Sequence, residues 1–161
     1  MIVMDFLGSE VELSNWLSDV MGLSRNDSRM LAMTVLYQID LFRRKKIDCQ
    51  VEDVIASNLE GIEDDCEFAK KLIYGVLDKE KELINKANQY LKNWDISRLG
   101  IPDAAILKVA IYELLYTDTP KKVCIDEAIL LAKDFSDEKV VGMINGVLDK
   151  VYHEQIEEGL E

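Results

Sequence analysis

Two arginines stand four residues apart in the stretch SRNDSRMLAMTVLYQ, which runs from Ser24 to Gln38. Arginine suits nucleic-acid phosphates because it displaces the counterions that condense on them. Arg25 and Arg29 are therefore candidate phosphate-binding residues at the start of a helix. The alternative interpretation is that both are ordinary solvated residues of a first helical turn.

The charge of the whole chain is −12, which by itself disfavours a nucleic-acid partner. The distribution of charge matters more than this sum. Residues 21–50 contain six basic and three acidic side chains and have a charge of +3, whereas the rest of the chain has a charge of −15. The basic run from Arg43 to Lys46 either stabilises the end of a helix or widens this positive surface.

The sequence contains no G-x-G-x-x-G, P-loop, G-x-S-x-G or H-E-x-x-H motif. Three cysteines, Cys49, Cys66 and Cys124, form no close pair and are expected to be reduced thiols. The single histidine, His153, lies among glutamates, and no spacing matches a metal site. We expect no enzyme, no catalytic residue, no cofactor and no metal. A divergent enzyme is a further possibility, but no residue of the sequence supports it.

The composition predicts one soluble, all-α protein. A length of 161 residues is about one domain, and 48% apolar with 31% charged residues is typical of globular proteins. Only two prolines and eight glycines interrupt the chain, which favours long helices. No apolar run approaches the roughly 20 residues that span a bilayer, and Asp5 stands where a secretory signal would be basic. We expect a cytoplasmic protein with no membrane segment.

Residues 1–23 are predicted to be an amino-terminal extension, followed by a helical domain at 24–161. Within the extension, apolar residues from Leu13 to Met21 recur every three to four positions after a capping box that begins at Ser9. Three outcomes are open for this amphipathic helix. It packs on its own domain, contacts a second copy in a homodimer, or folds on a partner.

The same spacing predicts the remaining helices, which together form a compact bundle of about seven or eight. The first is capped by Asn26 or Asp27 and reaches Phe42. The next helices are expected at Val51 to Leu59 and from about Asp65 toward Trp94, where the pattern fits one helix or two. Another runs from Gly100 to Tyr116. The last two are opened by the Thr119 hydroxyl, with Pro120 in the first turn, and by Ser136, Asp137 and Glu138.

Two glycines, Gly75 and Gly146, lie inside helical patterns. Glycine costs about 1 kcal/mol relative to alanine in a helix interior. We attribute both glycines to close helix packing that a side chain would obstruct.

Several sequence blocks occur in an order that resembles the NusB family of bacterial transcription antitermination factors. The resemblance covers about Arg25 to Tyr152. The blocks are AMTVLYQ (32–38), FAKKLIYGV (68–76), PDAAILKVAIYELLYTDTPKKVCIDEAILLAKDF (102–135) and INGVLDK (144–150).

The resemblance implies an all-helical fold of two packed subdomains. It also implies two ligands: NusE, a small-subunit ribosomal protein, and the single-stranded boxA element of ribosomal RNA transcripts. The resulting assembly alters the behaviour of RNA polymerase as part of an antitermination complex. Recognition of this kind combines phosphate contacts with stacking on bases and needs no chemistry on a substrate.

By the same resemblance, Arg25 and Arg29 mark the two ends of a stretch that is arginine-rich in the family, while residues 26–28 here are not basic. We therefore expect weaker RNA binding than is usual for the family. Each lost phosphate contact removes a favourable release of counterions, and it also lowers the salt dependence of binding. An alternative is that the chain is a NusB-like protein-interaction module with weak or no RNA binding.

Further site residues are implied in the same way. Asn145, Asp149 and Lys150 resemble positions near the RNA surface, where Asp149 would restrain affinity by repelling phosphate. Glu113 resembles a position on the face that meets NusE, against the alternative of a solvated helix residue. Tyr37 either stacks on a base or packs in the domain.

Overall fold

The computed structural model describes residues 23–160, which form seven α-helices and one 3-10 turn with no strand. The predicted all-α class is confirmed. The helix expected between Ser9 and Met21 lies outside the described residues. The elements are α3 (Arg25–Arg44), α4 (Val51–Asn58), α5 (Glu67–Asp78), α6 (Glu80–Tyr90), η1 (Ile96–Arg98), α7 (Ile101–Tyr116), α8 (Lys121–Phe135) and α9 (Glu138–Leu160).

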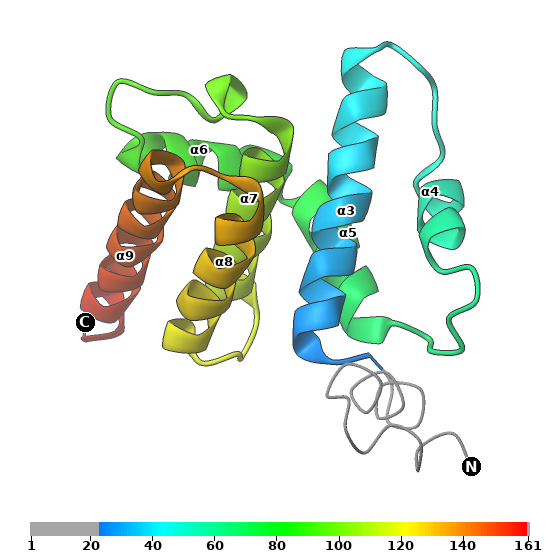
Figure 1. Ribbon diagram of the computed structural model, residues 1–161. Helices are drawn as coiled ribbons and strands as arrows, with labels where there is room; N and C mark the ends of the chain where they lie inside the picture. The colour runs from blue at the N-terminus through cyan, green and yellow to red at the C-terminus, as the bar shows by residue number, and fades with distance from the viewer. Residues whose placement is uncertain (1–22, 161) are drawn as a thin grey trace, which may run out of the picture.

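Helix α7 is the centre of the molecule. It packs against α3, α5, α6, α8 and α9, and almost every residue from Ala104 to Leu114 is buried. A helix that is apolar on all sides can be stable only when neighbours cover every face. Figure 1 shows α3, α4 and α5 on one side of the molecule and α6 to α9 on the other, with α3 beside α7. The packing of α3 and α5 on α7 therefore joins the two halves.

The ends of two helices differ from the prediction. Helix α3 is capped by Ser24, whose hydroxyl oxygen accepts a hydrogen bond of 3.0 Å from the backbone N–H of Asp27. Asn26 and Asp27 lie inside the helix instead. Helix α8 begins at Lys121, because Pro120 has an extended ψ of 133° and is the N-cap. The start of α8 has no side-chain capping hydrogen bond, so the predicted cap by the Thr119 hydroxyl is absent. The prediction that Pro120 lies in the first turn was also wrong.

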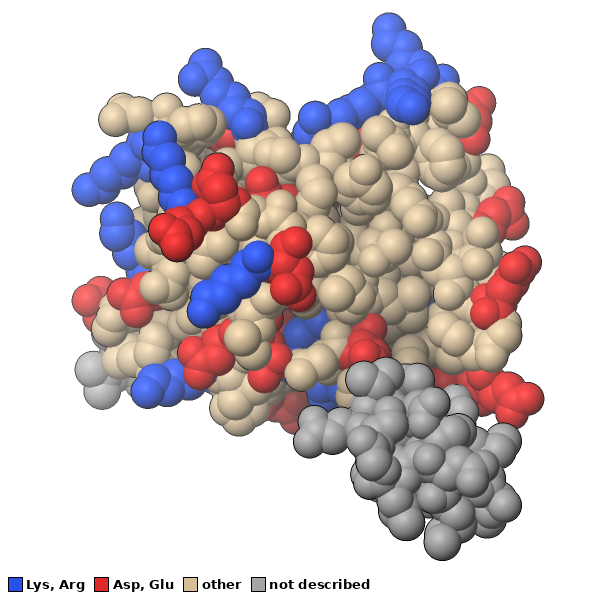
Figure 2. Space-filling model, viewed as in Figure 1, with Lys and Arg blue, Asp and Glu red and all other residues tan. Residues whose placement is uncertain are grey.

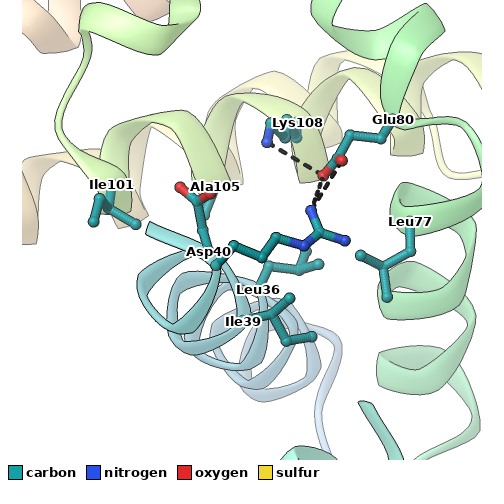
Figure 3. Close-up of a pocket in the computed structure, with 9 residues that line it drawn as sticks. Leu36, Ile39, Asp40, Leu77, Glu80, Ile101, Ala105 and Lys108 are labelled. Carbon is teal, nitrogen blue, oxygen red and sulfur yellow. Dashed lines mark hydrogen bonds and ion pairs between the residues drawn. The ribbon is translucent and has the colours of Figure 1, made fainter. Parts of the chain in front are cut away.

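The stretch after Asp65 forms two helices, which answers the question that the apolar spacing left open. Helix α5 ends at Asp78 and α6 begins at Glu80, with Lys79 between them at φ −103° and ψ 14°. Glu80 then lies where it can bond to two other helices. Its carboxylate accepts hydrogen bonds of 3.0 and 3.2 Å from Nη1 of Arg43 and of 3.5 Å from Nζ of Lys108 (Figure 3). This cluster ties the end of α3 to α6 and α7.

The two helical glycines have different explanations. A Cβ atom at Gly75 would overlap the ring of Tyr112 on α7, so the predicted close packing is confirmed there. A Cβ atom at Gly146 would meet no neighbour within 4 Å. The packing explanation was wrong for Gly146 because this glycine lies on the exposed side of α9, while Val147 and Leu148 face the core as predicted.

Candidate nucleic-acid interface

Arg25 is the first residue of α3 and is exposed. Its guanidinium carbon lies 3.8 Å from the centroid of the Phe68 ring, near the start of α5. A cation over an aromatic face is attracted by the ring quadrupole. Phe68 therefore holds the Arg25 guanidinium at a defined place on the surface. No local pattern predicts this contact, because 43 positions separate the two residues.

Arg29, one turn further along α3, is buried. Its Nε and Nη2 atoms donate hydrogen bonds of 2.7 and 2.6 Å to the two carboxylate oxygens of Glu113 on α7. The exposed fractions of the two side chains are 5% and 1%. The hydrogen bond to Glu113 raises the pKa of Arg29, so this guanidinium is charged at every ordinary pH.

This ion pair overturns one interpretation of Arg29 and Glu113. Neither is a solvated helix residue, because each satisfies the other inside the protein. The third guanidinium nitrogen, Nη1, donates a hydrogen bond of 2.9 Å to Oδ1 of Asn26. The predicted contact of Arg29 with RNA and of Glu113 with a partner stay predictions, and either contact would have to compete with the existing pair.

A groove of about 480 Å³ runs along the amino end of α3. It lies between the first turns of α3 and the start of α8, and two carboxylates, Asp118 and Glu127, line it together with Arg25. A third carboxylate, Asp64, accepts a hydrogen bond of 3.0 Å from the backbone N–H of Leu23. A backbone hydrogen bond from Cys66 lowers the pKa of Asp64 and keeps it ionised. The arginine end of α3 is therefore surrounded by negative charge.

The three candidates on α9 are all exposed. Asn145 and Asp149 are one helical turn apart, and Lys150 follows. Oδ1 of Asp149 lies 3.5 Å from Nε2 of His153, one turn further on. These side chains are accessible to a ligand, and their contact with RNA stays a prediction. Tyr37 is half-buried and packs against the core, so the packing interpretation of this residue is confirmed.

The surface of α3 between its charged ends is uncharged. From Met30 to Ile39 the helix has no ionisable side chain other than Tyr37, and Figure 2 shows a broad uncharged area over this part of the molecule. Half-buried residues recur along this face at helical spacing: Met30, Thr34, Tyr37 and Leu41. A neutral, partly apolar face of this kind is suited to contact with another protein.

The three cysteines are unpaired thiols, and burial raises the pKa of Cys66 and of Cys124, the latter to about 12. Within residues 23–160 no group of three or more His, Cys, Asp or Glu side chains could hold a metal ion. No helix in the same range is long and apolar enough to cross a membrane.

The fold and the surface together define an all-helical scaffold with exposed polar and charged side chains at the amino end of α3 and on α9. Residues 26–153 match the model of the NusB family. The chain belongs to this family, as the sequence blocks predicted.

Individual relatives agree with this assignment. The transcription antitermination protein NusB of Macrococcus caseolyticus is 40% identical over 129 residues, which are 80% of this chain and 96% of the relative. The structure of T. maritima NusB superposes with a TM-score of 0.73 at 31% identity and covers 82% of this chain and 92% of that one. A crystal structure of the antitermination factors NusB and NusE in complex with dsRNA has a TM-score of 0.70 at 26% identity, covering 81% and 96%.

Proposed function

We propose that this protein is an RNA-binding transcription antitermination factor. It acts with NusE on boxA-type single-stranded RNA in ribosomal RNA transcripts, in the cytoplasm, as part of an RNA polymerase antitermination complex. The observation that carries this proposal is the match to NusB proteins over nearly their whole length, including the NusB that was crystallised with NusE and RNA.

The amino end of α3 supports the RNA part of the proposal. Arg25 is exposed and already positioned by Phe68, so little side-chain freedom is lost when it binds a phosphate. Arg29 is the second proposed RNA contact, and it would have to exchange its ion pair with Glu113, which joins the first turns of α3 to α7, for a phosphate. Asn145 and Lys150 would add contacts from α9, and Asp149 would oppose them.

The uncharged face of α3 supports the protein part of the proposal. NusE would cover Met30, Thr34, Tyr37 and Leu41, which the bundle leaves half-exposed. An RNA-binding partner that is itself basic would also offset the carboxylates around Arg25. RNA binding should therefore be weak for the protein alone and tighter with NusE present.

The test measures binding of boxA-type RNA to the Arg25→Ala variant at several salt concentrations, with and without NusE. We expect weaker binding and a salt slope reduced by roughly 0.7, the value for one single-strand phosphate contact. Arg25→Lys, which keeps the charge, should retain most of the slope. Unchanged affinity and slope in Arg25→Ala would show that RNA does not contact this surface. A duplex of the same sequence separates single-strand from double-strand recognition.

A second candidate function is a NusB-like protein-interaction module with weak or no RNA binding. The carboxylates Asp64, Asp118 and Glu127 at the arginine end of α3 favour it. The same titration distinguishes the two functions. A module of this kind would bind NusE normally while showing no salt-dependent RNA binding, and Asp149→Asn would not raise its RNA affinity. The mass of the free protein in the same buffer reports whether it forms a homodimer.

A further inference from the structure

The carboxyl end of α3 has the opposite electrostatic character from its amino end. Four consecutive basic residues, Arg43 to Lys46, lie where the helix stops, and all four are exposed. Figure 2 shows basic side chains gathered at this end of α3. Ile47, the next residue, is 50% exposed. The run therefore forms a compact, positively charged patch on the surface.

Two of these four charges have partners. Arg43 bonds to Glu80, and Nε of Arg44 lies 3.4 Å from Oδ2 of Asp40. Lys45 and Lys46 form no ion pair with any residue between 23 and 160. The negative end of the helix dipole is equivalent to about half an elementary charge, so it balances only part of the positive charge of the two lysines. Most of the positive charge of these two lysines is therefore available to a ligand.

The form of this surface favours a polyanion as its ligand. Lysine ammonium groups bind phosphates as point charges on flexible stems, without needing a shaped pocket. The cores of protein interfaces, in contrast, are depleted in lysine. An acidic protein is therefore the less suitable partner.

We propose that Lys45 and Lys46 form a second phosphate-binding surface, which holds single-stranded RNA that extends past the segment bound at the amino end of α3. This inference rests on the proposed RNA-binding function. Twenty residues separate Arg25 from Lys45, which corresponds to about 30 Å along the helix. At about 3.4 Å per phosphate in a stacked strand, this distance spans roughly nine nucleotides. The second surface should therefore act only on RNA longer than the first segment.

The test compares the full chain with a Lys45→Gln, Lys46→Gln double variant, with NusE present in every titration. Two boxA-type RNAs are used, one of about eight nucleotides and one of about twenty, which bracket the separation of the two surfaces. A matched control is the Lys92→Gln, Lys133→Gln double variant, which loses the same charge at two exposed positions, one in the turn after α6 and one on α8.

We expect the Lys45 and Lys46 variant to bind the long RNA several-fold more weakly, with a salt slope smaller by about 1.4 for two phosphate contacts. Its affinity for the short RNA should equal that of the parent, and the control should bind both RNAs like the parent. Unchanged affinity for the long RNA would overturn the inference and leave an acidic protein as the candidate ligand. An equal loss in the control, or an equal loss on both RNAs, would overturn it as well. If the parent binds neither RNA, the proposed function itself fails.

Discussion

Both carboxylate oxygens of Glu113 accept hydrogen bonds from the guanidinium of Arg29, and this buried pair joins the amino end of α3 to the carboxyl end of α7. A second ion pair, between Lys86 and Glu154, has a similar separation of 3.0 Å but is one-quarter exposed. The two pairs make a direct comparison of a fully buried and a partly buried contact.

Glu113→Ala should lower the free energy of unfolding by about 3–5 kcal/mol, because it leaves the Arg29 charge buried without a partner. Lys86→Ala should cost less, about 1 kcal/mol, since water reaches that pair and screens it in part. Urea denaturation of the two variants measures both values. Equal losses would mean that burial does not strengthen the Arg29–Glu113 contact. A variant with both Arg29→Met and Glu113→Leu should recover much of the loss, because it removes both charges together.

Gly75→Ala and Gly146→Ala should change stability in opposite directions. The alanine methyl group at Gly75 would overlap the Tyr112 ring, and overpacking of this kind costs about 1–3 kcal/mol. At Gly146 the methyl group meets open space, and alanine should stabilise α9 by up to about 1 kcal/mol. Thermal unfolding of the two variants provides the measurement. A loss of stability in Gly146→Ala would point to a neighbour that covers this side of α9.

Stability should fall as the pH rises from about 9 toward 12. Burial raises the pKa of the Cys124 thiol from 9.0 to about 12, so in this window the folded protein keeps a proton that the unfolded chain has released. The unfolded state is then favoured by up to about 1.4 kcal/mol per pH unit for each such proton. The hydrogen bond to Glu82 raises the pKa of Tyr116 to about 12 and adds to the same trend.

Urea titrations at several pH values between 8 and 12 measure this slope. Cys124→Ala should make the decline less steep, because one of the shifted groups is removed. An identical slope in parent and variant would show that the thiol does not contribute. Below about pH 9 neither state releases the proton, so stability should not respond to this group there.

A chain that begins at Leu23 should bind RNA more tightly than the full chain and be less stable. The expected helix between Ser9 and Met21 is acidic at Glu10, Glu12 and Asp19, and Leu23 bonds to Asp64 beside the arginine end of α3. Burying one large apolar side chain of this helix is worth roughly 1.5–3 kcal/mol. Unchanged RNA affinity would exclude an inhibitory role of the extension. An unchanged melting temperature would show that it does not pack on the domain.

Local patterns along the chain were sufficient to predict where most of the helices lie and which family the chain belongs to. Apolar residues that recur every three to four positions report a helix locally, so the strong pattern from Ile101 to Tyr116 was sufficient to predict α7. Pro102 and Asp103 predicted where this helix begins, because the residue preferences of a first turn depend only on neighbours along the chain. The ordered blocks from Ala32 to Lys150 likewise identified the NusB family.

The surroundings of individual charged residues depend on packing between helices that are far apart in the sequence. Arg25 and Arg29 are the same residue type one turn apart, but Arg25 lies over Phe68 at the surface and Arg29 is buried against Glu113. The partner of Arg29 is 84 positions away, and no local pattern records which helix packs on which. Because α7 is apolar all round, α3 must cover one of its faces, and that packing buries one arginine while it leaves the other in water.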